Sequence, residues 1–242
     1  MNLIIPDWPA PAAVKALITT RQGGVSTAPF DSFNLGDHVG DDPLAVAQNR
    51  AQLAALTPSG PLWLKQVHGV RVVDVAHACV NTEADASVAF APSQVAAVMT
   101  ADCLPALFCN RDGTVVGAAH AGWRGLLDGI LEATVATMAV PPAGIMVYLG
   151  PAIGPQAFEV GDEVRQAFVA HDAAAAAAFR PHGAGKWLAD IYQLARQRLR
   201  NAGVNSVYGG NDCTYSDPHR FYSYRRDGQT GRMASLIWIN PV

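Results

Sequence analysis

Residues 104–120 read LPALFCNRDGTVVGAAH, and this stretch decides the fold that we expect. Two apolar runs flank NRDG, whose residue types favour a tight turn, so the stretch predicts an antiparallel β-hairpin. If Asn110 pairs with Gly113, counting back along both strands places Cys103 directly opposite His120. Facing side chains of antiparallel strands have Cβ atoms about 4.5 to 5.5 Å apart, which lets a thiolate and an imidazole bind one zinc ion.

His68 is the expected third ligand, because it ends the run LWLKQVH, where a side chain can project into a cleft, and is followed by Gly69. Three protein ligands leave the fourth tetrahedral position of zinc for water or substrate, and the bound water then has a pKa of about 7. Two alternatives stay open. Cys103 and His120 also suit a metal-free thiol nucleophile with its base, and a free cysteine often only packs in the core. Pro105 cannot donate to a ladder and therefore weakens the expected register.

Apolar periodicity predicts the remaining elements. Strands are expected at 14–20, 61–67, 70–75, 95–100, 104–109, 114–119, 145–150 and in the terminal MASLIWI. A helix is expected to follow Asp42, which can cap it, with Pro43 at its first position, and to run to about Leu56. Further helices are expected at 125–138, 161–170 and 187–201, and the alanine run 173–178 also favours helix. This order predicts an α/β (α+β) protein, a single domain over residues 1–242 with mixed β-sheets flanked by helices.

Composition limits the partners of the chain. Its 242 residues are half apolar and carry a formal net charge of −3, so there is no broad basic field for nucleic acid or a membrane. The four cysteines form no CxxC pair, and the N-terminal residues lack the pattern of a signal peptide. No stretch is long and apolar enough to span a bilayer. We therefore expect a cytoplasmic protein with reduced thiols.

Seven motifs carry a resemblance to a known family, and they follow one another from about residue 15 to the C-terminus. They are TTRQGGVS (19–26), NLGDHVGDD (34–42), QVHG (66–69), TADCLPALF (100–108), AAHAGWRGL (118–126), LGPAIGP (149–155) and RFYSYRRDGQTGR (220–232). Together they resemble the YfiH-like family, also called laccase-domain or polyphenol oxidase-like purine nucleoside phosphorylases.

The resemblance implies a zinc ion held by the histidine of QVHG, the cysteine of ADC and the histidine of HAGWRG, which here are His68, Cys103 and His120. It also implies phosphorolysis of adenosine, inosine and methylthioadenosine to a free base and a ribose 1-phosphate, together with deamination of adenosine. The expected fold is an α/β arrangement of mixed sheets, and many members of the family are monomers. The expected partners are thus purine nucleosides and phosphate.

Further side chains are candidates for this chemistry. Arg21 lies beside a glycine pair where the backbone can approach a ligand, Arg124 lies at a helix start that suits phosphate, and Arg225 follows an aromatic run. Asn34 is expected to line the cleft. Asp102 is a candidate proton shuttle, although it also suits the capping of a turn.

Three other functions compete with phosphorolysis. Copper-dependent oxidation of phenols needs more histidines than the seven of this chain, commonly as His-x-His pairs, which are absent here. Two histidines and a cysteine can nevertheless hold a single copper ion as an alternative to zinc. A cytoplasmic hydrolase that edits peptidoglycan precursors would use the same zinc-bound water or thiolate. A pure ligand-binding role is disfavoured by the density of polar motifs.

Overall fold

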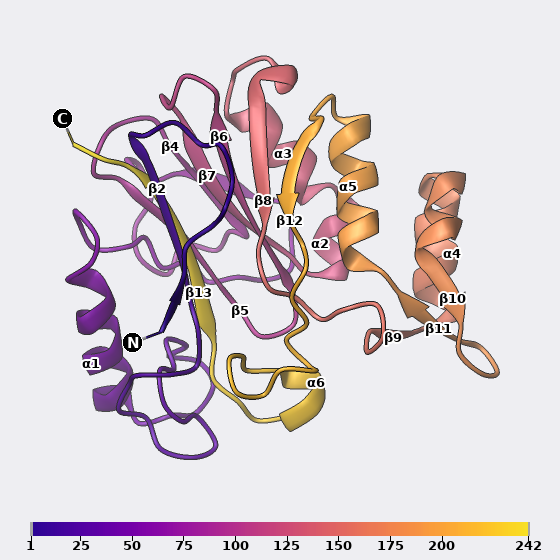
Figure 1. Ribbon diagram of the computed structural model, residues 1–242, viewed down its shortest axis with the longest axis horizontal. Coiled ribbons are helices and arrows are strands. Elements are labelled where there is room, and N and C mark those ends of the chain that lie inside the picture. The colour runs from indigo at the N-terminus through magenta and orange to yellow at the C-terminus, as the bar shows by residue number, and fades with distance from the viewer. Residues whose placement is uncertain (1, 242) are drawn as a thin grey trace.

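The computed structural model of the protein describes residues 2–241. Two β-sheets stack face to face and helices cover their outer faces, so the main body has four layers (Figure 1). One sheet has four strands in the order β1-β2-β13-β5, and the other has six in the order β12-β8-β6-β7-β4-β3. A third sheet, β10-β11-β9, lies with α4 at the side of this body (Figure 1). The mixed α/β class expected from the sequence is confirmed.

The strands are β1 (Leu3–Ile4), β2 (Val14–Thr19), β3 (Val72–Asp74), β4 (Ala86–Ala89), β5 (Val95–Thr100), β6 (Leu104–Asn110), β7 (Val116–Ala121), β8 (Ile145–Leu149), β9 (Glu159–Gly161), β10 (Phe179–Pro181), β11 (Lys186–Ala189), β12 (Ser206–Gly209) and β13 (Met233–Ile239). The α-helices are α1 (Pro43–Ala54), α2 (Trp123–Asp128), α3 (Ile130–Thr137), α4 (Asp162–His171), α5 (Ile191–Asn201) and α6 (Tyr224–Asp227).

The predicted hairpin is present as β6 and β7, but its expected register is wrong. Pro105, not Cys103, lies opposite His120, so the pairing is shifted by two residues. The cause is the side chain of Asn110, whose Oδ1 accepts hydrogen bonds from the backbone N–H groups of Thr114 (2.9 Å) and Val115 (3.1 Å). These bonds stabilise a longer loop than the predicted turn.

Side-chain alternation along β6 explains how one strand serves two cores. Leu107 and Cys109 face the four-stranded sheet, where they pack with residues of β2, β5 and β13. Leu104, Ala106 and Phe108 face the other way and pack against α2, α3 and α5. A strand buried on both faces has no polar face, which is why β6 reads as a continuous apolar run.

Several predicted boundaries differ from the structure for local reasons. The expected helix 125–138 is two helices, because Gly129 adopts a left-handed conformation with φ of 105° and separates α2 from α3. The start of the expected helix 187–201 is strand β11, which pairs with β9 and β10. The expected strand 61–67 forms only isolated bridges, and the alanine run 173–178 is a 3-10 helix.

Helix α1 fixes the long loop that precedes it. Asp42 accepts a hydrogen bond from the backbone N–H of Leu44 (3.0 Å) and Pro43 is the first helical residue, as predicted. The buried side chain of Asn49 donates to the carbonyls of Ser32 (3.2 Å) and Asn34 (2.9 Å). The polar segment 21–36 is therefore attached to the helix at several points.

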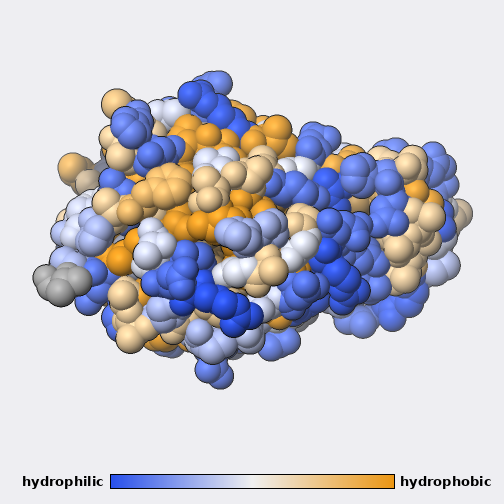
Figure 2. All heavy atoms as spheres, turned by 90° about the horizontal axis from the view of Figure 1, so that it is seen from above, coloured by the Kyte–Doolittle hydropathy of each residue, from blue (hydrophilic) through white to orange (hydrophobic). Residues whose placement is uncertain are grey.

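The end of the body opposite α6 carries an apolar area near its middle, bordered by hydrophilic side chains (Figure 2). Within residues 2–241, no helix has the length and hydropathy needed to cross a membrane.

The packing of α1 gives a test of the outer core. Leu53 is fully buried against the four-stranded sheet, whereas Leu44 on the same helix is 79% exposed. We expect Leu53→Ala to lower the free energy of unfolding by about 2 to 5 kcal/mol. The matched change Leu44→Ala should alter it by less than about 0.5 kcal/mol in urea titrations. Equal effects of the two substitutions would contradict this account of the core.

Candidate metal site and its two cavities

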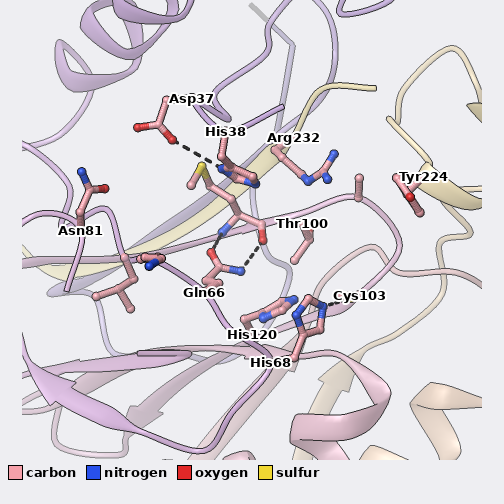
Figure 3. A pocket seen from close by; sticks show the side chains of 14 residues that line it. Asp37, His38, Gln66, His68, Asn81, Thr100, Cys103, His120, Tyr224 and Arg232 are labelled. Atoms are coloured by element: carbon pink, nitrogen blue, oxygen red, sulfur yellow. Dashed lines mark hydrogen bonds and ion pairs between the residues drawn. The ribbon is translucent and has the colours of Figure 1, made fainter. Parts of the chain in front are cut away.

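The candidate site lies where the chain passes from one sheet to the other. Strand β5 belongs to the four-stranded sheet and β6 to the six-stranded sheet, so residues 101–103 connect the two. Cys103 stands at the end of this link, and His120 lies near the end of β7. His68 comes from the loop before β3, and its ring approaches the other two side chains (Figure 3).

The three side chains have the spacing of a metal site. Their ligand atoms all lie within 4.8 Å of one another, and Cys103 Sγ is 3.8 Å from His68 Nε2. Tetrahedral zinc with ordinary Zn–S and Zn–N bond lengths would place a sulfur and a nitrogen about 3.6 Å apart. The donor set of two imidazoles and one thiolate therefore fits a zinc ion without large movement. Across residues 2–241, this is the one group of three such side chains with converging ligand atoms.

Gly122 makes this close approach possible. A Cβ atom at this position would lie 2.7 Å from His68 Cδ2 and 3.1 Å from Cys103 Sγ. Its φ of −62° and ψ of 160° are open to any residue. Contact with the two ligands, not backbone conformation, therefore requires glycine here.

Asp85 holds two of the three candidate ligands in place. Its buried carboxylate accepts a hydrogen bond from His120 Nδ1 at 2.8 Å, which leaves His120 Nε2 available to a metal ion. The same carboxylate accepts from the backbone N–H groups of Val67 (3.2 Å), His68 (2.9 Å) and Gly69 (2.7 Å). These bonds stabilise His68 in a left-handed conformation with φ of 61°. A carboxylate behind a histidine ligand is a common support of metal sites.

Electrostatics favours the charged forms of this cluster. Burial opposes ionisation of Cys103, but His120 and His68 outweigh it and lower the pKa of the thiol to about 6. Burial likewise opposes charge on His120, but Cys103 and Asp85 raise the pKa of the imidazole to about 9. For Asp85 itself, burial is outweighed by hydrogen bonds from His120 and Gly69, and its pKa falls below the ordinary value. A thiolate is the form of cysteine that binds a metal ion, whereas the protonated ring of His120 would have to lose the proton on Nε2 to become a ligand.

Two cavities meet at the cluster. The larger has a volume of about 710 Å³, and its lining includes the polar side chains of Gln66, Thr100 and Arg232 (Figure 3). The smaller, of about 270 Å³, has apolar walls and two arginines. Both are lined by His68, Ala101, Cys103 and Tyr224. A substrate in either cavity therefore reaches the cluster.

The candidate substrate-binding residues separate into two groups. Arg124 and Arg225 line the smaller cavity. Arg21 lines neither cavity, because its guanidinium donates to Asp31 and to the carbonyl of Pro218. Asn34 is fully buried and is also not a lining residue. Its Oδ1 accepts a hydrogen bond from Arg232 N at 2.9 Å, so Asn34 acts on the cavity indirectly.

Asp102 lies next to the cluster but has little capacity left for proton transfer. One carboxylate oxygen accepts from Thr214 Oγ1 at 2.6 Å, and the other accepts from the backbone N–H of Arg225 at 2.7 Å. The bond from Arg225 attaches α6 to the link between the sheets, and the bond from Thr214 attaches the segment before that helix. The geometry supports the capping role for Asp102 over the proton shuttle.

Sequence reasoning missed Asp85, Gly122, Gln66 and Arg232. Gln66 donates to the Met99 carbonyl (2.8 Å) and accepts from the Met99 N–H (2.7 Å), which attaches the His68 loop to β5. Gln66, Gly122 and Arg232 all lie inside the quoted motifs, so those motifs could have indicated them as candidate site residues. Asp85 lies outside all of them.

These features match a known family. The family model described as multi-copper polyphenol oxidoreductase laccase matches residues 15–240. The chain belongs to this family, the YfiH-like laccase-domain proteins.

Its relatives resemble it over nearly their whole length. A purine nucleoside phosphorylase of Pseudomonas aeruginosa is 59% identical over 98% of both chains. The purine nucleoside phosphorylase YfiH of Escherichia coli K12 is 58% identical over 98% of this chain and 99% of the relative. A crystal structure of a Neisseria meningitidis protein is 55% identical, covers all of both chains and superposes with a TM-score of 0.96. The crystal structure of Bacillus licheniformis YfiH, 31% identical, covers 94% of this chain and 93% of the other with a TM-score of 0.90.

Gly122 gives a direct test of the site. We expect Gly122→Ala to lower metal affinity by at least about 10-fold, because the new methyl group would collide with His68 and Cys103. Gly144→Ala is the matched control, since nothing lies within 4 Å of a Cβ atom there. Metal content after dialysis against a competing chelator measures the difference. Full metal retention by Gly122→Ala would contradict the proposed ligand geometry.

Asp85 gives a second test. In Asp85→Asn the amide nitrogen cannot accept hydrogen bonds, so at least one of the four N–H donors is left without a partner. We expect metal affinity to fall by about 10- to 100-fold. The control is Asp74→Asn, because Asp74 also accepts from a histidine, His77 Nδ1 at 3.1 Å, but at the surface. Chelator competition on both variants measures the effect, and equal affinities would argue against a supporting role for Asp85.

Proposed function

We propose that the protein is a zinc-dependent purine nucleoside phosphorylase acting on adenosine, inosine and methylthioadenosine, with adenosine deamination as a second activity. The observation that carries this proposal is the convergence of His68, Cys103 and His120 at the place where two cavities meet. Relatives that are 58 and 59% identical over almost their whole length, and that are named purine nucleoside phosphorylases, support it.

Phosphorolysis forms one bond, breaks another and transfers one proton. An oxygen of hydrogen phosphate forms a bond to C1′ of the ribose, while the C1′–N9 bond breaks and its electron pair leaves with the purine. The proton of the phosphate hydroxyl ends on the purine, so the products are the free base and ribose 1-phosphate. The site must therefore hold an anion and a neutral nucleoside together.

The residues of the chain supply several of these needs. His68, Cys103 and His120 would hold the zinc ion, which when bound supplies a Lewis acid beside the reacting groups. The larger cavity has room for a nucleoside and phosphate together. Three arginines, Arg124, Arg225 and Arg232, line the two cavities and can bind the anion.

A copper oxidase is less well supported. A multi-copper centre needs further groups of histidines, and the part of the chain that the structure describes brings together one such group, with two histidines. That group can hold one copper ion, so the metal present in a purified sample does not by itself identify the reaction.

The proposal is tested by incubating the zinc-loaded protein anaerobically with each nucleoside and phosphate. We expect ribose 1-phosphate, or its methylthio analogue, and free base in equal amounts. Chelation should abolish the reaction and added zinc restore it. Cys103→Ser should lower kcat/KM by at least about 100-fold, since it removes a ligand.

The matched control is Cys79→Ser, because Cys79 is an exposed cysteine outside both cavities. It should leave the rate unchanged. Inosine formed from adenosine without phosphate would reveal the deaminase activity. Absence of product from all three nucleosides would overturn the proposal, and oxygen-dependent turnover of a phenol or amide cleavage of a peptidoglycan precursor would then identify the competing function.

A further inference from the structure

Arg232 is a partly buried arginine that lines the larger cavity and has no carboxylate partner among residues 2–241. Five others, Arg21, Arg50, Arg198, Arg220 and Arg226, form ion pairs with carboxylates. Within residues 2–241, no carboxylate lies at ion-pair distance from Arg232, although the side chain is half-buried. A partly desolvated cation without a counter-ion is costly, and an anionic ligand would relieve that cost.

The surrounding chain holds Arg232 in one position. Its backbone N–H donates to Asn34 Oδ1, and its Nη1 donates to the carbonyls of Thr230 and Gly231, both at 3.0 Å. Gly36 leaves room for its aliphatic stem, because a Cβ atom there would lie 2.8 Å from Arg232 Cγ. The guanidinium is thus preorganised from two loops.

One edge of this guanidinium remains free. Only Nη1 donates to protein acceptors among the described residues, which leaves Nε and Nη2 without a protein acceptor. This pair of parallel donors has the fork geometry that binds two oxygens of a phosphate at once. Arg232 lies across the larger cavity from the candidate metal ligands (Figure 3).

The neighbours of Arg232 are compatible with an anion. Thr100 lines the same cavity, and its hydroxyl makes no hydrogen bond to any residue within 2–241. Asp37 also lines this cavity, but Arg50 Nη1 neutralises it at 3.2 Å. Burial and Arg232 lower the pKa of His38, and its Nδ1 faces the Asp37 carboxylate at 3.5 Å, so this ring does not add a positive charge that would compete with Arg232 for an anion.

The two arginines of the smaller cavity are less suited to the same task. Both Arg124 and Arg225 are exposed, so water competes for their donors. Arg124 lies over the ring of Trp123, with 4.4 Å between Cζ and the centroid. Arg225 donates Nη1 to the Glu159 carbonyl at 2.9 Å. Their cavity is otherwise lined mainly by apolar side chains.

We propose that Arg232 binds the phosphate co-substrate through its Nε and Nη2 donors, with the Thr100 hydroxyl beside it. This assignment rests on the proposed phosphorylase function, and it places the anion on the wall opposite the metal ligands. Asn34 is then a positioning residue, since it acts on the phosphate only through Arg232.

Steady-state kinetics of the zinc-loaded enzyme at varied phosphate test this assignment. Arg232→Gln should raise the KM for phosphate by on the order of 30-fold or more, because it removes the charge and the fork, and leave the KM for nucleoside nearly unchanged. Arg232→Lys keeps the charge without the fork and should raise it by about 10-fold. Arg200→Gln, a change of an exposed arginine outside both cavities, is the matched control.

Zinc content and thermal unfolding of each variant show whether the site and fold are intact. If Arg232→Gln does not fold, the KM for phosphate of Arg232→Lys decides whether the assignment holds. An unchanged KM for phosphate in the folded variants, or a rise confined to Arg124→Gln or Arg225→Gln, overturns the assignment while leaving the phosphorylase proposal standing.

Direct binding separates failure of this assignment from failure of the proposed function. If the zinc-loaded protein phosphorolyses none of the nucleosides, calorimetric titration with inorganic phosphate still reports on Arg232. Binding that is lost in Arg232→Gln and kept in Arg200→Gln supports the anion site. Absent binding, or equal binding by all variants, overturns it.

Discussion

The carboxylate of Asp85 is the point on which the candidate site depends. It is a buried charge that accepts four hydrogen bonds, from the backbone of Val67, His68 and Gly69 and from the ring of His120. A buried carboxylate is tolerated only when it is satisfied in this way. The loop of His68 and the strand of His120 are therefore attached to a single group. Asp85 immediately precedes β4, so this group also attaches the site to the six-stranded sheet.

The layered fold explains why the site lies where it does. Both sheets are apolar between their facing surfaces, so polar chemistry is restricted to the ends of the strands. The link 101–103 crosses from one sheet to the other at such an end, and it brings Asp102 and Cys103 together there. Asp102 attaches α6 to this link, while Cys103 faces the cluster. One short connection thus serves both as a structural joint and as part of the candidate active site.

The sequence predicted the positions of helices and strands better than it predicted the pairing of the strands. NRDG indicated the β6–β7 hairpin, but the two hydrogen bonds to Asn110 Oδ1 that lengthen its loop depend on side-chain geometry and not on turn propensity. The expected Cys103–His120 pairing was therefore wrong by two residues, although the structure does bring both side chains to one place. β11 read as the start of a helix because half of its pairing is with β9, where partners such as Trp187 and Val160 lie 27 residues apart in the chain. Asp85 lacked a signal of its own, since its main partner His120 lies 35 residues away.

The separation of the three ligand residues along the chain has a thermodynamic consequence. His68, Cys103 and His120 belong to three different segments, and only the folded protein brings their ligand atoms within 4.8 Å. An ion bound by all three would favour the native state over the unfolded chain, by an amount that grows with the logarithm of its free concentration. Occupancy of the site by the metal ion and the free energy of unfolding would then be thermodynamically linked. The surrounding supply of metal would therefore help to set how long the folded protein survives.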